Sequence, residues 1–259
     1  MRPMATLSIV TVTYNAEAFL ERTLRSFQEC LADDPALKNE VEYLVIDGAS
    51  TDSTLTIAQK YAGIIDHTIS EKDAGLYDAM NKGLARATGA YLWFLNAGDE
   101  IHDPKTLARL LGSIKENRPD VLYSDALIVN NAGLPLGLRS ELMPHKLPKN
   151  IVWRDFTYGM KICHQAFVAK KSICPFYDTT NLSADLDWEI VCLKRAQKTV
   201  FLDFILCKYL TGGLSAKRRW RSLADRYLVL KTHFGLLRNL LNHLWIVVRA
   251  VLHQTAKRL

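Results

Sequence analysis

The side chains best suited to chemistry follow short apolar segments. The run Tyr91–Leu95 is apolar, and it leads directly into Asn96, Gly98 and Asp99. A carboxylate just past a buried strand, after a glycine that lets backbone approach a ligand, suits a hard cation such as Mg²⁺ or Mn²⁺. Such a cation would neutralise charge on a departing diphosphate. Because acidic residues at strand ends also act as simple caps, Asp99 alone leaves both interpretations open.

Two more polar clusters follow strand-like segments. Asp47 opens the run 47–52 (DGASTD), where a carboxylate can accept hydrogen bonds from the N–H groups of a base and small residues leave room. The same run is also typical of a turn followed by a helix cap. Thr13, Tyr14 and Asn15 end the first apolar run and could hold a base or a ribose. No GxGxxG follows that run and the chain has no P-loop motif, which disfavours both kinds of nucleotide fold.

An alternation of strand and helix patterns positions these clusters. The strand patterns are Leu7–Thr13, Val41–Ile46, Ile64–Ile69, Tyr91–Leu95 and Val121–Ser124, and the helix patterns are Ala16–Leu31, Asp52–Tyr61, Leu76–Ala87 and Lys105–Glu116. This rhythm predicts an α/β fold with a doubly wound, mostly parallel sheet flanked by helices. In such sheets ligands bind at the carboxyl ends of the strands, where the polar clusters lie.

The second half of the chain is less regular. Residues 126–160 contain glycines and prolines with little periodicity, which predicts a hairpin and a long loop, a common place for acceptor contacts. Regular patterns return as a strand over Gln165–Ala169, a helix over Leu186–Ala196 and a strand over Thr199–Leu206.

Charge separates the last segment from the rest. Residues 216–259 contain ten lysines and arginines against one aspartate, a net charge of +9, so residues 1–215 carry −3 of the total of +6. A leucine-rich stripe follows Gly235 on a predicted helix, but Arg238 and Arg249 interrupt it, which makes it a poor transmembrane helix and a fair interfacial one. We therefore expect a domain over 1–215 and a basic, amphipathic, membrane-associating helical tail over 216–259. The stripe could equally pack on the domain or on a second subunit, so an oligomer is possible.

Other features bound the cellular setting. The chain has five cysteines and no CxxC pair, which favours buried thiols in a reducing compartment. No signal peptide precedes the first strand pattern, so we expect a cytoplasmic protein, peripheral at the inner face of the cytoplasmic membrane. The basic residues lie on a leucine-rich helix and not among spaced aromatic platforms, which disfavours nucleic-acid binding.

Four motifs in order resemble family 2 glycosyltransferases with the GT-A fold. They are 8–15 (SIVTVTYN), 45–52 (VIDGASTD), 73–83 (DAGLYDAMNKG) and 89–99 (GAYLWFLNAGD), and the resemblance extends over about residues 7–215. Within the family the chain is similar to bacterial exopolysaccharide enzymes, including those of colanic acid synthesis. The resemblance implies an inverting, metal-dependent transfer of a hexose from a nucleotide-diphosphate sugar to a saccharide acceptor. We expect that acceptor to be lipid-linked.

The resemblance also implies roles for single residues. Thr13, Asn15 and Asp47 would contact the nucleotide, and Asp73 with the stretch after it would line the donor sugar and phosphates. Asp99 would bind Mg²⁺ or Mn²⁺, since Asn96 and Gly98 stand where the family's metal motif usually has further aspartates. The residues expected at the donor are Thr13, Tyr14, Asn15, Asp47, Ser50, Asp73, Asn81, Asn96, His164 and Gly213. Of these, Gly213 belongs to a run, 211–215, that resembles the loop closing over the donor diphosphate.

Inverting members of the family carry a catalytic aspartate at the start of a late helix. Asp185 matches that position, Ala184 stands where a second acid often precedes it, and Asp187 is the alternative base. The chemistry needs a carboxylate within hydrogen-bond reach of the acceptor hydroxyl. Both acids could instead simply favour the dipole of a helix N-terminus. His164 could likewise touch phosphate or acceptor, or be a packed histidine.

Two other functions fit parts of this pattern. A nucleotidyltransferase has a similar sheet and uses metal, but it usually carries a glycine-rich basic loop after the first strand, which is missing here. A catalytically inactive nucleotide-sugar binder or membrane scaffold would explain the short metal motif. Turnover of a donor with and without a chelator separates these alternatives.

Overall fold

The computed structural model describes residues 5–143, 146–213 and 218–256. Within them, the main sheet has seven strands in the order β10-β6-β9-β4-β1-β2-β3. Neighbouring strands are parallel, except that β9 is antiparallel to both β4 and β6. The strands are β1 (Leu7–Thr13), β2 (Val41–Asp47), β3 (His67–Ser70), β4 (Tyr91–Phe94), β6 (Val121–Tyr123), β9 (Phe167–Lys170) and β10 (Thr199–Phe201).

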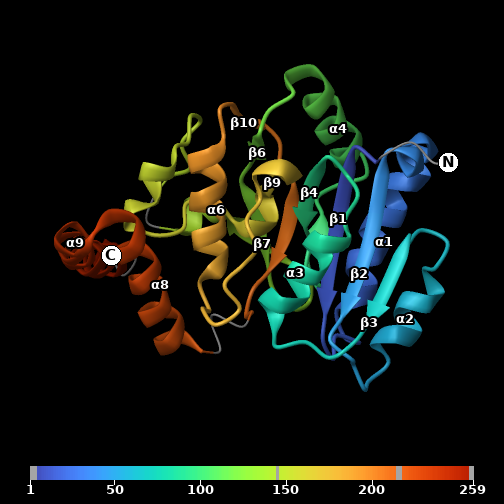
Figure 1. Ribbon diagram of the computed structural model, residues 1–259, viewed down its shortest axis with the longest axis horizontal. Helices are drawn as coiled ribbons and strands as arrows, with labels where there is room; N and C mark the ends of the chain where they lie inside the picture. Colours follow the sequence, from blue (N-terminus) through green and yellow to red (C-terminus); the bar gives the residue numbers. More distant parts are fainter. Residues whose placement is uncertain (1–4, 144–145, 214–217, 257–259) are drawn as a thin grey trace.

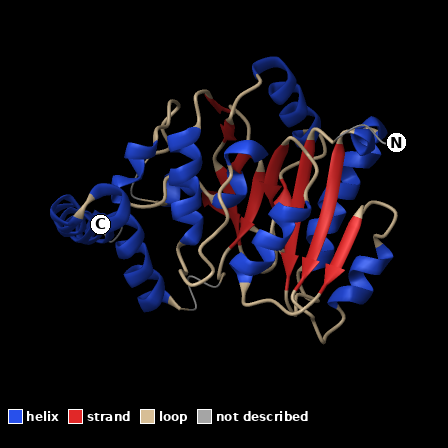
Figure 2. Ribbon diagram, viewed as in Figure 1, coloured by secondary structure: helices blue, strands red, loops and turns tan. Residues whose placement is uncertain are grey.

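Helices cover both faces of this sheet (Figures 1 and 2). β1 and β2 are buried along their whole length, which explains why their sequences are continuous apolar runs and not alternating patterns. The α-helices of the body are α1 (Leu20–Asp33), α2 (Thr54–Lys60), α3 (Leu76–Arg86), α4 (Thr106–Asn117), α5 (Arg139–Leu142) and α6 (Ala184–Arg195). Short 3₁₀ turns are η1 (Pro35–Asn39), η2 (Trp153–Tyr158), η3 (His164–Ala166) and η4 (Lys171–Ile173).

A smaller sheet joins the two halves of the chain. Its order is β5-β11-β7-β8, with β5 (Glu100–Ile101), β7 (Ala126–Val129), β8 (Pro135–Leu138) and β11 (Cys207–Leu210). β11 is antiparallel to β5 and parallel to β7. Since β5 directly follows Asp99, this sheet brings a late strand against the predicted metal ligand.

The doubly wound, mostly parallel sheet predicted from the sequence is confirmed, with two differences. β9, which comes from the second half of the chain, lies between β4 and β6 and is antiparallel to both. It therefore fills the space between two strands that run in the same direction. The late strands are also shorter than predicted: β9 begins at Phe167, after η3, and β10 ends at Phe201.

Two helices follow the body. α8 (Arg219–Phe234) and α9 (Leu236–Ala256) are joined by Gly235, whose φ of +79° suits glycine and permits the sharp turn. α8 packs on α6, and α9 packs on α8 and η2, so the pair lies beyond α6 at the left of Figure 1. Among the described helices, none combines the length and the apolar character needed to cross a membrane.

Candidate active site

Asp47 ends β2 at the centre of a dense hydrogen-bond cluster. Its Oδ1 accepts from the hydroxyls of Thr13 (2.9 Å) and Ser50 (2.5 Å). Its Oδ2 accepts from the Ser50 amide (2.9 Å) and the Ser70 hydroxyl (2.7 Å). Burial by itself raises the pKa of Asp47, but these hydrogen bonds outweigh it and hold the pKa below its ordinary value. Asp47 is therefore an anion fixed at the carboxyl ends of β1, β2 and β3.

The loops after β1 and β2 are tied together beside this cluster. The Asn15 amide donates to the Ser50 hydroxyl (2.8 Å), and Asn15 Oδ1 accepts from the Thr51 amide (2.9 Å). Asn15 has φ +46°, a left-handed conformation that asparagine tolerates better than most residues. Tyr14 stays 67% exposed next to this junction, which leaves its ring free to cover a planar ligand.

Asp73 lies against the same loop. A Cβ added to Gly48 would collide with Asp73 Oδ2, and it would come within 3.3 Å of the Tyr14 ring. Gly48 therefore permits the close approach of Asp73, whose Oδ1 accepts from the Gly75 amide (2.8 Å). Thr13, Tyr14, Asn15, Asp47, Ser50 and Asp73 thus form one group at the sheet edge.

Asn81 has a different setting. Its side-chain amide donates to the Tyr177 carbonyl (2.9 Å), and its Oδ1 accepts from the Tyr177 amide (2.7 Å). Both polar groups of Asn81 therefore join α3 to the segment that precedes α6. In this structure Asn81 ties the two halves of the chain together.

Asp99 follows β4, the strand next to β1 in the sheet, and its side chain is buried. Its Oδ1 accepts from the Leu210 amide (2.9 Å), and its own amide donates to the Asn96 carbonyl (3.0 Å). Gly98 has φ +103°, and a Cβ there would lie 2.6 Å from Leu210 Cδ2, so glycine lets β11 pack beside Asp99. Burial raises the pKa of Asp99 to about 8, against hydrogen bonds that lower it.

The residues around Asp99 fit a hard divalent cation. Asp99 supplies one carboxylate, and Asn96 Oδ1 is a buried oxygen without a hydrogen-bond partner among the described residues. Ions such as Mg²⁺ are often held by one or two carboxylates, with water and substrate phosphates completing the coordination. Across the described ranges, no group of three His, Cys, Asp or Glu side chains gathers to hold a metal. A cation at Asp99 would thus need ligands from water or a bound diphosphate.

Asp185 lies in the first turn of α6, where its Oδ1 accepts from the Leu186 amide (2.9 Å). Burial raises its pKa, while the hydrogen bond from the Leu186 amide, the nearby Tyr77 hydroxyl and the charge of Arg139 oppose the rise. The Tyr77 hydroxyl itself donates to the Leu182 carbonyl (3.2 Å). Tyr77 belongs to α3, the helix that begins just after Asp73. The predicted base is therefore next to the helix that carries the donor-side motif.

Tyr77 and Arg139 were not singled out in the sequence. The guanidinium of Arg139 is held by the carbonyls of Lys161 (2.6 Å) and Met160 (3.1 Å). Arg139 lies in the region 126–160, whose sequence has little periodicity. Nothing there signals that the charge of a cation would act on Asp185, whereas Tyr77, four residues after Asp73, lies inside a quoted motif.

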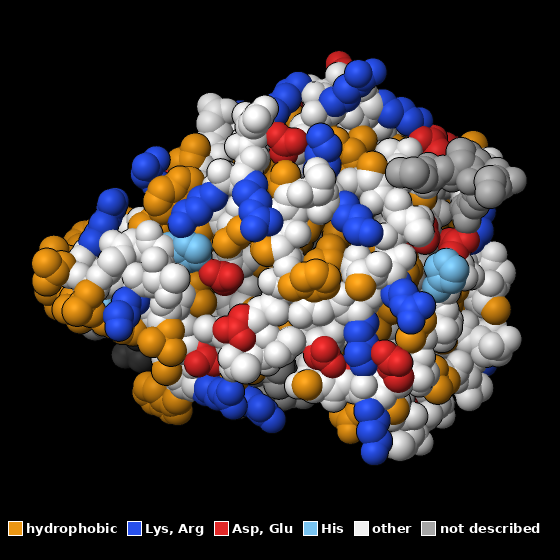
Figure 3. All heavy atoms as spheres, viewed as in Figure 1, with side chains coloured by type: hydrophobic (Ala, Val, Ile, Leu, Met, Phe, Trp, Pro, Cys, Tyr) orange, Lys and Arg blue, Asp and Glu red, His pale blue; other side chains and the backbone are white. Residues whose placement is uncertain are grey.

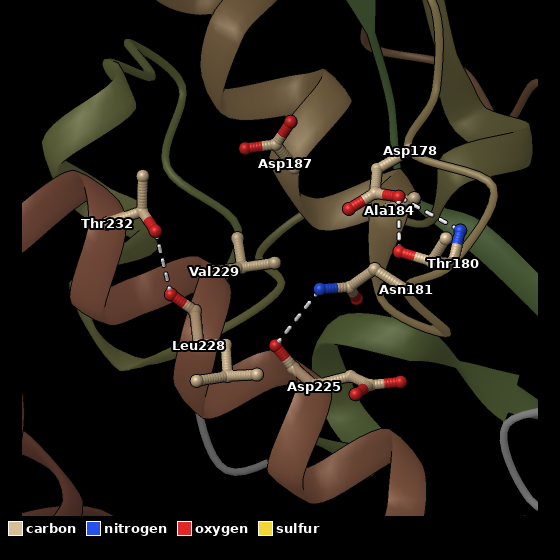
Figure 4. A pocket seen from close by; sticks show the side chains of 9 residues that line it. All are labelled: Asp178, Thr180, Asn181, Ala184, Asp187, Asp225, Leu228, Val229 and Thr232. Atoms are coloured by element: carbon tan, nitrogen blue, oxygen red, sulfur yellow. Dashed lines mark hydrogen bonds between the residues drawn. The ribbon is translucent and has the colours of Figure 1, made fainter.

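Asp187, the alternative base, faces the tail. Its Oδ1 lies 2.6 Å from His233 Nε2, and Lys194 Nζ lies 2.7 Å from His233 Nδ1. A pocket of about 340 Å³ lies beside this contact, between the start of α6 and α8 (Figure 4). Its lining residues are Asp178, Thr180, Asn181, Ala184, Asp187, Asp225, Leu228, Val229 and Thr232. The two candidate bases therefore differ in their surroundings: Asp185 meets Tyr77, and Asp187 meets α8.

His164 lies in the interior, in an aromatic cage. Its Nε2 is 3.0 Å from the Tyr177 hydroxyl, and its Nδ1 is 3.5 Å from Glu189 Oε1. The rings of Phe94 and Trp188 enclose it. Burial lowers the pKa of His164 to about 3 and raises the pKa of Glu189 well above its ordinary value. We therefore assign a neutral His164 beside a protonated Glu189, one turn along α6 from Asp185.

The expected closing loop is described only in part. Gly213 is exposed, and a Cβ added to it would lie 3.6 Å from the Tyr209 hydroxyl. Ser215 and Lys217 lie outside the described residues. The described part of this loop therefore places Gly213 just past β11, the strand whose Leu210 binds Asp99.

Comparison with known sequences gives a consistent picture. The model of the family described as Glycosyl transferase family 2 matches residues 8–174. A PGL/p-HBAD biosynthesis glycosyltransferase of Mycobacterium tuberculosis is 32% identical over 218 residues, which cover 80% of this chain and 78% of that protein. The poly(ribitol-phosphate) beta-N-acetylglucosaminyltransferase TarS of Staphylococcus aureus is 31% identical over 144 residues, 54% of this chain and 24% of TarS.

Solved structures share the fold. TarS 1–349 in complex with UDP-GlcNAc superimposes with a TM-score of 0.68 at 22% identity, covering 86% of this chain. This chain spans only 64% of that TarS fragment. A mannosyltransferase from Pyrobaculum calidifontis in complex with GDP-Man and Mn²⁺ gives a TM-score of 0.63 at 15% identity, covering 98% of this chain and 79% of that one.

Proposed function

The chain belongs to glycosyl transferase family 2, and on that premise we propose that it transfers a hexose from a nucleotide-diphosphate sugar to a saccharide acceptor with inversion. One observation carries the proposal. The carboxyl group of Asp185, in the late helix α6, lies beside Tyr77 of α3, whose hydroxyl donates to the Leu182 carbonyl (3.2 Å). Asp47 ends β2 and Asp99 follows β4, and these two strands flank β1 in the same sheet. The residues proposed to bind the donor and the proposed base therefore lie on elements that meet at the carboxyl ends of the strands.

The nucleotide would bind at the Asp47 cluster. All four acceptor positions of the Asp47 carboxylate are filled, two of them by the hydroxyls of Ser50 and Ser70. A hydroxyl can rotate, so N–H groups of a base would take the place of one of these serine donors. Tyr14 is exposed beside Gly48 and would cover the base, and Asp73 would contact the sugar or phosphates.

Asp99, with Asn96, would hold Mg²⁺ or Mn²⁺, and the bound cation would offset the charge of the diphosphate leaving group. The mannosyltransferase from Pyrobaculum calidifontis was crystallised with GDP-Man and Mn²⁺, and this supports a divalent metal here. The backbone amide of Leu210 donates to Asp99 Oδ1 and so holds the carboxylate in place. Gly98 leaves the room that Leu210 needs beside it.

Asp185 would act as the base. Its raised pKa gives it a greater affinity for a proton than an ordinary aspartate has, which suits a group that accepts one from a hydroxyl. As the acceptor oxygen forms its bond to the anomeric carbon, the bond to the diphosphate breaks, and the hydroxyl proton passes to an Asp185 oxygen. Displacement from the opposite side inverts the anomeric configuration.

The acceptor would be a lipid-linked saccharide in the synthesis of a cell-surface polysaccharide, at the inner face of the cytoplasmic membrane. The name of TarS gives a polymer, poly(ribitol-phosphate), as the substrate of that relative, which supports an acceptor of this general kind. The basic tail, with a net charge of +9 over residues 216–259, also supports work beside anionic lipid.

The direct test is a thermal-shift screen of UDP-, GDP-, CMP- and dTDP-sugars, each with and without Mn²⁺. A ligand that binds only the folded state raises its stability by mass action, about 2.7 kcal/mol at one hundred times its Kd. We expect one nucleotide class to raise the Tm, and more so with Mn²⁺. A Tm that no donor changes would favour the inactive scaffold.

Removal of the proposed metal ligand tests whether the Tm shift and the turnover depend on Mn²⁺ bound at Asp99. Asp99→Ala should abolish the part of the Tm shift and of the turnover that depends on Mn²⁺, because it removes the main carboxylate at the site. Asp103→Ala, which removes a nearby acid whose carboxylate accepts from the Lys105 amide just before α4, is the control. Turnover by Asp99→Ala that still responds to Mn²⁺ and to chelator would reject the metal role of Asp99.

A further inference from the structure

Over the part of α9 whose side chains the structure describes, residues 236–246, the asparagines face inward and the leucines face outward. Asn239 and Asn242 lie on its inner face with 0% and 8% of their surface exposed. On its outer face, Leu237 and Leu241 are 78% and 70% exposed. A surface helix of a globular protein ordinarily presents the opposite arrangement, with apolar residues toward the core.

Polar contacts hold the inner face in this orientation. The Asn239 side-chain amide donates to the Tyr227 carbonyl of α8 (3.1 Å), and His243 Nδ1 lies 2.9 Å from the Asn239 carbonyl. The rings of Tyr227 and His243 pack edge to face at 4.9 Å. The contacts between α8 and α9 thus use the polar side of α9 and leave the leucine side toward solvent.

The outer face forms one patch. Its members are Leu236, Leu237, Leu240, Leu241, Leu244 and Trp245, each at least 49% exposed. Trp220, 84% exposed, and Leu228, 52% exposed, add to the apolar surface of α8. Single exposed apolar residues are ordinary, but a contiguous group of this kind marks a surface that contacts something else. We call the six α9 residues the leucine face.

The basic residues around the leucine face indicate what kind of partner it contacts. Arg238 lies exposed within α9, and the exposed residues Arg218, Arg219, Arg221 and Lys231 lie on or beside α8. Figure 3 shows apolar atoms at the left edge of the molecule with Lys and Arg atoms near them. A second copy of the chain would bring an equally basic surface against this one, whereas anionic lipid head groups would neutralise it.

We propose that the leucine face docks on a bilayer that contains anionic lipid, with α9 in the plane of the interface. The proposal rests on the proposed function only for the identity of the lipid-linked acceptor. Three contacts tie the tail to α6: the Asp225 carboxylate accepts from the Leu182 amide (2.9 Å), the Ser183 hydroxyl donates to the Ser222 carbonyl (3.1 Å), and Asp187 pairs with His233. A docked tail would therefore hold the Asp185 end of α6 near the membrane.

The test is sedimentation of the full chain with two kinds of vesicle, one of phosphatidylcholine alone and one of phosphatidylcholine mixed with phosphatidylglycerol. We expect strong binding to the mixed vesicles. The triple variant Leu237→Ser, Leu241→Ser, Leu244→Ser should bind them at least about tenfold more weakly, because burying one leucine side chain is by itself worth about that factor.

Matched controls separate this effect from a general loss of hydrophobic surface. Leu134→Ser with Leu136→Ser removes leucines that are 61% and 51% exposed in the β7–β8 hairpin, and it should leave vesicle binding unchanged. Lys231→Gln with Arg238→Gln should weaken binding to the mixed vesicles but not to phosphatidylcholine. Circular dichroism of each variant checks that the helices remain folded.

Three outcomes would overturn the proposal. They are a wild-type chain that stays in the supernatant with mixed vesicles, a triple variant that sediments as well as wild type, and a wild-type dimer in ultracentrifugation that the triple variant abolishes. The last result would assign the leucine face to a second copy of the chain. Donor-induced Tm shifts should persist in the folded triple variant, so failure of vesicle binding and failure of the proposed function give different results.

Discussion

Asp47 and Glu189 are both buried carboxylates, yet the structure treats them in opposite ways. Asp47 receives four hydrogen bonds, and its pKa lies below the ordinary value although burial pushes it up. Neither oxygen of Glu189 has a hydrogen-bond partner among the described residues, and its pKa lies well above the ordinary value. Burial alone therefore does not decide the charge of a carboxyl group; the donors around it do.

The difference follows from what surrounds each group. Asp47 lies where strands end, so loop amides and serine and threonine hydroxyls point at it. Glu189 lies on α6, whose amides are already used within the helix, and its carboxyl group faces the ring of His164, which packs against the ring of Trp188. The sheet edge where we propose that the donor binds thus keeps a permanent anion, and α6 keeps carboxyl groups with high proton affinity, including Asp185.

The largest effect should come from Asp185→Asn. The amide cannot take the acceptor proton, so transfer should fall by about 10² to 10⁴-fold while the donor still raises the Tm. Asp187→Asn is the matched control, since Asp187 pairs with His233 and should leave transfer near the wild-type rate. If Asp187→Asn alone stops transfer, the base is misassigned and the contrast between the two sides of the molecule fails.

Asp47→Asn should have the next effect, on stability and donor binding. An Asn amide would face groups that donate to the carboxylate, so the free energy of unfolding should drop by about 1–3 kcal/mol and the donor Tm shift should vanish. The loss should be largest at neutral pH and shrink in acid, because a lowered pKa contributes stability that disappears as pH falls through it. Asp203→Asn, at a side chain 90% exposed, is the control for denaturant unfolding. Equal stability of both variants at pH 7 would contradict this role.

Glu189→Gln should have the smallest effect on transfer and donor binding, and its effect on stability should be of opposite sign. A raised pKa means that the unfolded chain ionises first, so wild-type stability falls as pH rises above the ordinary Glu value, by about 1.4 kcal/mol per pH unit while only the unfolded state is ionised. The variant has no such loss, so its Tm should match wild type near pH 4 and exceed it at pH 8. A variant less stable at pH 8 would mean that Glu189 is an anion paired with a charged His164.

The contrast also shows how far residue types predict a site. Asp47 and Asp99 could be selected because each follows a buried strand, and the parallel sheet that this pattern predicts brings such positions to one edge. His164 could not be placed, because its surroundings come from Phe94, Tyr177 and Glu189, which no local pattern connects. Asn81 was expected at the donor, and only the structure reveals its two hydrogen bonds to Tyr177.

By itself, the sequence determined the strand and helix alternation, the motifs at the strand ends and the basic tail. The family and its GT-A fold, expected from those motifs, are confirmed. Only the tertiary structure decided that β9 runs antiparallel, that Asp187 pairs with His233, that the charge of Arg139 acts on Asp185, and that α9 buries Asn239 and Asn242. The physical reason is that periodicity and caps act over a few neighbouring residues, whereas these pairings join residues tens of positions apart, and their outcome depends on packing across the whole molecule.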